Sequence, residues 1–107
     1  MAYRIELSPT AFDDIEGIVS YIANDSPENA NRWRRNLFDK FRRLDLMPQG
    51  YPLAPESEYC RCDVRQIMFG RYRILFMIRD EDQLVYVLTI RHGARRFLTR
   101  QEVTDIE

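Results

Sequence analysis

The segment from Cys60 to Arg96 constrains the fold of this chain most, because it is rich in the β-branched and aromatic residues that favour strands. Its middle run, Tyr72–Arg79, is almost wholly apolar, and its last run, Leu84–His92, is nearly so. Gly70-Arg71 and the four polar residues 80–83 separate the runs. Such short breaks predict three antiparallel strands in a meander. The nearly continuous apolar runs indicate strands that are covered on at least one face.

Two helices are predicted before this segment. Ser8-Pro9 and Ser26-Pro27 each combine a capping residue with a proline at the first helical position. The first helix follows a short alternating strand over residues 2–7, and the second runs from Pro27 to about Met47. Each carries one apolar stripe at three- and four-residue steps, which comprises Ala11, Ile15, Ile18, Val19 and Ile22 in the first helix and Ala30, Trp33, Leu37, Phe41 and Leu44 in the second.

Two features of the first helix need an explanation. Gly17 costs about 1 kcal/mol in a helix interior, and we expect a close helix crossing there. The three carboxylates Asp13, Asp14 and Glu16 are interpreted as residues favoured near the positive helix N-terminus rather than as acid–base groups.

The element order β-α-α-β-β-β predicts an α+β fold in which a helix hairpin packs on one face of a mainly antiparallel four-stranded sheet. The other face is expected to be left to solvent or to a partner. All 107 residues form one domain, 1–107. The C-terminal tail, 92–107, has sparse apolar residues and is expected to be mobile or partner-dependent, possibly a short helix.

Composition excludes several classes of protein. No apolar run approaches the roughly 20 residues that span a bilayer, and the N-terminus does not resemble a signal peptide, so we expect a cytoplasmic protein with no membrane association. Cys60 and Cys62 lie two apart on one predicted strand, which suits two reduced cysteines rather than a bridge. With a single histidine, no four-ligand zinc site is available, and we expect neither a metal nor a cofactor.

Charge is unevenly distributed along the chain. The net charge is −1, yet residues 59–100 carry nine arginines against four acidic residues. Lys40 is the one lysine in the sequence. Because the guanidinium fork matches carboxylate and phosphate geometry, the strand block predicts an acidic protein segment or a polyanion as partner.

Several motifs together resemble the RelE/ParE superfamily of toxins from bacterial toxin–antitoxin modules. They are SPTAFDDIEGIVSYIA near the start, Arg65 with Tyr72-Arg73-Ile74, and Ile90-Arg91-His92-Gly93 at the end of the last strand. The resemblance covers essentially the whole chain. It implies the RelE/ParE-like fold, a role in plasmid stabilisation or addiction, and a cognate antitoxin that binds and silences the chain.

The superfamily has two branches that differ in mechanism. RelE-like members are ribosome-dependent mRNA endonucleases, and here Arg65, Arg73 and Arg91 would stabilise the phosphate while His92 acts as acid or base. ParE-like members bind and inhibit DNA gyrase without hydrolytic activity. No lysine follows Lys40 and no tyrosine follows Gly93, so the nuclease set is incomplete and the ParE-like branch is favoured.

On the ParE-like interpretation, no catalytic residue is expected and the protein binds no nucleic acid sequence-specifically by itself. The target-binding residues are then Arg91, His92, Arg95 and Arg96. Arg61, Arg65 and Arg73 are expected to face the antitoxin or a polyanion from the open side of the strands. The plainer alternative is that each arginine pairs with nearby acids or covers an exposed sheet face, and that His92 is structural.

Overall fold

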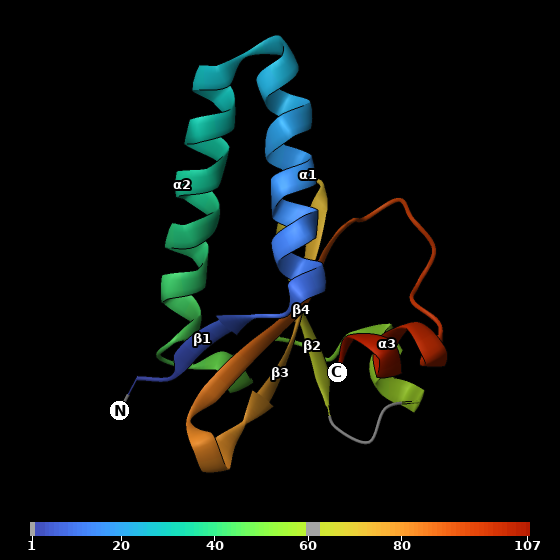
Figure 1. Cartoon of the computed structure of the whole chain (residues 1–107). Helices are drawn as coiled ribbons and strands as arrows, with labels where there is room; N and C mark the ends of the chain where they lie inside the picture. Colours follow the sequence, from blue (N-terminus) through green and yellow to red (C-terminus); the bar gives the residue numbers. More distant parts are fainter. Residues whose placement is uncertain (1, 60–62) are drawn as a thin grey trace.

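The computed structural model describes residues 2–59 and 63–107. Its four strands form one sheet in the order β1-β4-β3-β2 (Figure 1). β1 pairs parallel with β4, and the other two pairs are antiparallel. The strands are β1 (Arg4–Leu7), β2 (Val64–Phe69), β3 (Tyr72–Arg79) and β4 (Leu84–His92). The predicted mainly antiparallel four-stranded sheet is therefore confirmed.

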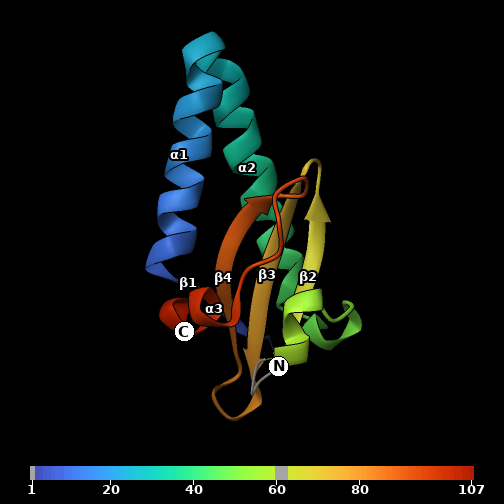
Figure 2. The same cartoon turned by 90° about the vertical axis from the view of Figure 1, so that its right-hand side faces the viewer.

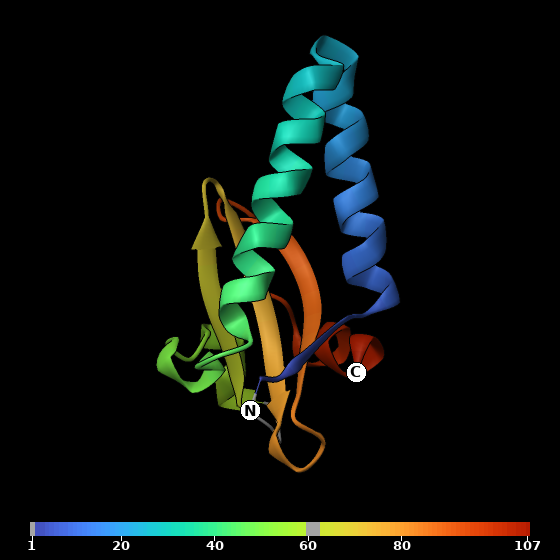
Figure 3. The same cartoon turned by 90° about the vertical axis from the view of Figure 1, so that its left-hand side faces the viewer.

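Two long helices form a hairpin over one face of the sheet and extend beyond its end (Figures 1 and 3). They are α1 (Pro9–Asp25) and α2 (Pro27–Leu44), and a short third helix, α3 (Arg100–Ile106), lies on the other face (Figure 2). Three 3-10 segments, Pro48–Gly50, Pro55–Tyr59 and Asp80–Asp82, complete the chain. In the described part, no helix has the length and apolar character needed to cross a membrane.

The predicted helix starts are confirmed. The Ser8 hydroxyl accepts a hydrogen bond from the Ala11 N–H at 2.9 Å, and the Ser26 hydroxyl accepts one from the Asn29 N–H at 3.1 Å. The second helix ends at Leu44, before the predicted end near Met47. The Tyr3 N–H donates to the Asp45 carbonyl at 2.9 Å, so the chain leaves the helix where it meets the segment leading into β1.

The main core lies between the helix hairpin and the sheet. Ala11 and Ile15 of α1 and Leu37, Phe41 and Leu44 of α2 pack with Ile67, Ile74, Phe76, Val85, Val87 and Ile90 of the strands. Trp33, half-buried, contacts Phe69 and Tyr72 edge-on, with ring centroids 5.7 Å apart in both pairs. Burial of these side chains is the main force that holds the hairpin on the sheet.

The two strand turns lie where the sequence predicts them. Gly70 has φ = +58° in the β2–β3 turn, and Gln83 has φ = +50° just before β4. The bounds of β3 and β4 agree with the two predicted apolar runs. Cys60 and Cys62 lie outside the described residues.

The second sheet face departs from the prediction, because it is covered rather than open. Ala54, Leu98 and Val103 pack there against Val64, Leu75, Met77 and Leu88. Thr99 and Glu102 form a reciprocal capping box at the start of α3. Val103 is 1% exposed, so the short helix that the tail was expected to form is present over Arg100–Ile106 and packs on the sheet.

The expected helix crossing at Gly17 is absent, because a Cβ added there meets nothing within 4 Å. Gly17→Ala is therefore expected to raise the free energy of unfolding by about 0.5–1 kcal/mol, since alanine loses less conformational entropy in a helix. Urea denaturation measures this change. Gly70→Ala is the matched control and should lower stability, because φ = +58° strains any residue with a Cβ. A loss of stability in both variants would contradict the prediction.

Candidate functional site

Arg73 and Arg91 lie opposite each other in the β3–β4 register, and both are buried. Arg73 is 4% exposed and Arg91 is 5% exposed. Both belong to the sheet face that α3 covers, where Arg96 contacts Arg91 and Phe97 contacts Arg73. The prediction that Arg73 lies on an open side of the strands is therefore wrong, and Arg91, which was predicted to bind the target, is buried as well.

Glu56 is the buried partner of Arg73. The guanidinium donates to both Glu56 carboxylate oxygens, at 2.7 and 3.1 Å, and also to the Gln66 side-chain oxygen at 2.8 and 3.0 Å. The Leu98 N–H donates to Glu56 Oε2 at 3.0 Å. Burial acts to raise the pKa of Glu56, but the hydrogen bonds from Arg73 and from Leu98 outweigh it and hold the pKa below its ordinary value.

Arg91 has a different environment. Its Nε donates to the Arg96 carbonyl at 2.9 Å, and its buried Nη2 has no hydrogen-bond partner among the described residues. Burial and the neighbouring Arg95 charge lower the pKa of Arg91. Arg91 therefore holds the C-terminal segment against the sheet and is not presented to solvent.

The side chains of Arg65 and Arg96 have other partners. Arg65 Nη1 donates to the Tyr51 carbonyl at 2.7 Å, and the Asp63 carboxylate lies 3.9 Å from Arg65. Arg96 is exposed and forms an ion pair with Glu102 at 2.7 Å. The hydrogen bond from Arg96 lowers the pKa of Glu102 to about 2. Arg61 lies outside the described residues.

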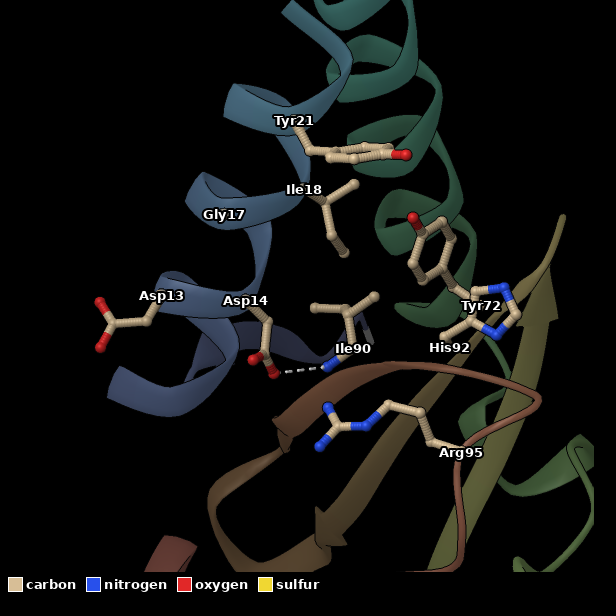
Figure 4. A pocket seen from close by; sticks show the side chains of 9 residues that line it. All are labelled: Asp13, Asp14, Gly17, Ile18, Tyr21, Tyr72, Ile90, His92 and Arg95. Atoms are coloured by element: carbon tan, nitrogen blue, oxygen red, sulfur yellow. Dashed lines mark hydrogen bonds between the residues drawn. The ribbon is translucent and has the colours of Figure 1, made fainter. Parts of the chain in front are cut away.

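His92 and Arg95, by contrast, meet at one open pocket of about 320 Å³ between α1 and the ends of β3 and β4 (Figure 4). Its other lining residues are Asp13, Asp14, Gly17, Ile18, Tyr21, Tyr72 and Ile90. Figure 4 shows Tyr21 and Tyr72 along one side and Arg95 on the side of Asp14. Two of the predicted target-binding side chains therefore lie in a common cavity.

The imidazole of His92 is fixed in orientation. Its Nδ1 accepts a hydrogen bond from the Ala94 N–H at 3.0 Å, and its ring lies edge-on to Tyr72 with centroids 5.6 Å apart. Because Nδ1 is an acceptor, the neutral ring carries its proton on Nε2. His92 therefore offers a donor rather than a free base.

Asp14 forms hydrogen bonds with the edge of β4 beyond the point where β1 ends. β1 ends at Leu7, opposite Val87, and beyond that point the Asp14 carboxylate accepts hydrogen bonds from the Thr89 hydroxyl and, at 3.1 Å, from the Ile90 N–H. Burial raises the pKa of Asp14 despite these hydrogen bonds and the Arg95 charge.

The interpretation of the three α1 acids as helix-start residues is wrong for two of them. Asp14 serves the sheet edge, and Glu16 forms an ion pair with Arg34 of α2 at 3.1 Å. The sequence reasoning also missed Gly17 and Tyr21 as pocket residues. Their spacing of four residues on one helix face was the available signal.

The lining of the pocket indicates which chemical groups it can recognise. Among residues 2–59 and 63–107, no group of three or more His, Cys, Asp or Glu side chains is placed to hold a metal ion. The pocket offers aromatic walls, an aliphatic part, and donors from His92 and Arg95. Such a combination recognises an acceptor group that is attached to an apolar or flat group.

The sequence and the fold are both similar to those of known proteins. The family model described as "ParE toxin of type II toxin-antitoxin system, parDE" matches residues 5–97. No curated protein gives a significant match to the sequence. Among solved structures, the chain is similar to one in the toxin–antitoxin complex RelBE2 from Mycobacterium tuberculosis, with 22% identity and a TM-score of 0.55 over 86% of this chain and 99% of that one.

A second similar structure is the archaeal RelE–RelB complex from Pyrococcus horikoshii OT3. It gives 15% identity and a TM-score of 0.53, over 90% of this chain and 100% of that one. Both likenesses support the RelE/ParE-like fold. Because the family model spans most of the sequence, this chain belongs to the ParE toxin family of type II toxin–antitoxin systems.

Proposed function

We propose that this ParE-family toxin inhibits DNA gyrase in the cytoplasm by binding to it, and that a cognate antitoxin neutralises the toxin. The main support is that the predicted site residues lie in two different environments. His92 and Arg95 line an open pocket, whereas Arg73 and Arg91 are buried against the chain's own C-terminal segment. Hydrogen-bond donors are thus available at the pocket, whereas the two buried arginines serve the fold. This arrangement is expected of a protein that acts by binding.

The alternative is an mRNA endonuclease of the RelE-like kind. That mechanism needs cations around one scissile phosphate and a proton acceptor for the attacking hydroxyl. Arg73 is bonded to Glu56, Arg65 is bonded to the Tyr51 carbonyl, and His92 Nδ1 is engaged by the Ala94 N–H. These contacts give the nuclease interpretation less support than the binding one.

The antitoxin part of the proposal has its own support. The matching family is defined by type II toxin–antitoxin systems, and both similar solved structures are toxin–antitoxin complexes. On this basis we also propose that the chain serves plasmid stabilisation or a comparable addiction role.

Supercoiling of relaxed plasmid by gyrase tests the proposed function. Folded protein titrated into the reaction is expected to inhibit supercoiling, heat-denatured protein is not, and prior addition of the cognate antitoxin should restore the activity. A parallel assay of mRNA cleavage in a translating extract is expected to show none. Intact supercoiling together with cleaved mRNA would replace the proposed function by the endonuclease alternative.

A further inference from the structure

We propose that two copies of this chain associate through the outer edge of β1, so that the sheet of one copy continues into the sheet of the other. The pairing is antiparallel and two-fold, and it is centred on Ile5. Such an association needs an open strand edge, room for the side chains of the second strand, and a charge pattern that is complementary to itself. β1 offers all three, and the proposal does not depend on the target of the toxin.

The backbone of β1 is open on one side. β1 lies at an edge of the described sheet, with β4 as its neighbour. The Arg4 N–H donates to the Gln83 carbonyl at 2.8 Å. Because successive residues of a strand direct their backbone groups to alternate sides, the N–H and C=O groups of Ile5 and Leu7 point away from β4. Such an edge can pair with the strand of another chain.

The other edge of the sheet is protected by the chain itself. At β2, the Gln66 N–H donates to the Pro52 carbonyl at 3.0 Å, and the Ala54 N–H donates to the Val64 carbonyl at 2.7 Å. A segment that contains proline therefore covers that edge, which is a usual protection against strand pairing. No described segment forms backbone hydrogen bonds along the outer side of β1 in this way. A second strand can therefore be added at β1.

An apolar groove of about 310 Å³ lies beside the open edge, between β1 and the last turns of α2 (Figure 1). Its lining includes Ile5 and Leu7 from β1 and Phe38 and Phe41 from α2. Phe38 is 37% exposed, so the groove is accessible from outside. A strand added to β1 directs every second side chain to this side of the sheet. In a second copy of β1 those side chains are apolar, which suits the groove.

The charges of β1 select a second copy as the occupant. Arg4 and Glu6 lie on the side of β1 away from the groove, and their side chains are 66% and 52% exposed. Pairing centred on Ile5 sets Arg4 of each copy opposite Glu6 of the other, where opposite side chains lie close together. Within one copy the two charges are 3.5 Å apart, and such an exposed pair contributes little by itself. The dimer therefore gains two complementary cross-strand pairs.

The neighbouring two-fold register is less favourable. It sets Ile5 opposite Leu7 but also sets Glu6 opposite Glu6, so like charges meet. In the proposed register, Ile5 of each copy pairs with Ile5 of the other, and the Leu7 N–H meets the Tyr3 carbonyl. The Tyr3 N–H already donates to the Asp45 carbonyl at 2.9 Å. The proposed register therefore uses the open N–H groups of Ile5 and Leu7 in both copies without the repulsion.

Reversal of one charge tests this register. Arg4→Glu sets two acids opposite each other and Glu6→Arg sets two cations opposite each other, so each variant alone should raise the dissociation constant of the dimer by about tenfold or more. An equimolar mixture of the two variants should regain the wild-type affinity, because the reversed charges are then complementary. Analytical ultracentrifugation measures the affinity. The matched controls Arg100→Glu and Glu28→Arg, both exposed on other elements, should dimerise like the wild type.

Hydrogen exchange locates the contact. The amides of Ile5 and Leu7 should exchange more slowly at high protein concentration than at low concentration, whereas the amide of Met68 at the β2 edge should not change. A wild-type protein that stays monomeric up to millimolar concentration overturns the proposal, and so does a dimer that both single variants preserve. Protection of Ile5 and Leu7 only in a complex with the antitoxin assigns this edge to the antitoxin and likewise overturns the proposal.

Discussion

Glu56→Ala is expected to lower the free energy of unfolding by about 3–5 kcal/mol, because it leaves the Arg73 guanidinium buried without its anionic partner. The substitution also removes the acceptor of the Leu98 N–H, and with it one attachment of the C-terminal segment. Urea denaturation followed by circular dichroism measures the loss. Hydrogen exchange at the amides of residues 98–106 should increase more than exchange in α2.

The double variant Glu56→Leu/Arg73→Met is the control for this prediction. It removes both charges and replaces them with apolar groups, so it should be clearly more stable than Glu56→Ala. Equal destabilisation of the two proteins would mean that the shape of the site, and not the uncompensated charge, dominates the cost.

Low pH is expected to weaken the contacts of Glu56 with Arg73 and with the C-terminal segment. The pKa of Glu56 lies below its ordinary value of 4.5, so the ionised carboxylate stabilises the fold at pH values above 4.5. That stabilisation is lost as the pH falls from 4.5 through the folded-state pKa. Asp14 changes stability in the opposite direction as the pH falls, because its raised pKa favours the protonated form in the folded protein. The fall in stability below pH 4.5 should therefore be smaller in Glu56→Gln than in the wild type.

Phe76→Ala is expected to lower the free energy of unfolding by about 3–5 kcal/mol, which is comparable to the effect of Glu56→Ala. Phe76 is 0% exposed at the centre of the main core, and its ring lies edge-on to Tyr51 with centroids 6.0 Å apart. Alanine leaves a cavity that the surrounding sheet and helices cannot close. Equilibrium urea denaturation measures the loss, with Phe76→Leu as a milder variant if the alanine protein does not fold.

Phe12→Ala provides the comparison. Phe12 is 55% exposed on α1, so the same chemical change there should alter stability by less than about 0.5 kcal/mol. A cost at Phe12 as large as that at Phe76 would contradict the description of the core.

Local sequence signals were enough to predict much of the fold. Ser8-Pro9 and Ser26-Pro27 marked helix starts because a capping hydroxyl and a fixed proline φ act within a few residues. Gly70 predicted a turn because glycine readily adopts the left-handed backbone conformation, which it has here. The apolar stripes of the hairpin then required a sheet to cover.

The direction of the arginines could not be predicted in the same way. β3 and β4 are apolar on both faces, so no alternation indicates which side Arg73 and Arg91 occupy. An irregularity in the pairing at Leu75 and Phe76 shifts the β3–β4 register. The partner Glu56 comes from a proline-rich segment whose path depends on tertiary contacts. The burial of Arg73 and Arg91 therefore follows from long-range packing.

The candidate site was predicted only in part. His92 and Arg95 were named from the strand end, but the opposite wall comes from α1, some seventy residues earlier in the chain. Gly17 and Tyr21 share one helix face at a spacing of four residues, but this spacing alone does not separate them from ordinary helix residues. They were found because the parallel pairing of β1 with β4 brings the start of α1 beside the end of β4.

The same pairing has a consequence for biosynthesis. Among the four strands that the structure describes, β1 is made first, and the strand that pairs with it is β4, which begins at Leu84. While a ribosome extends the chain, the helix hairpin has local partners but β1 lacks its strand partner. The pocket and the complete sheet assemble only after β4 has been synthesised. A nascent chain therefore lacks the pocket until β4 has left the ribosome.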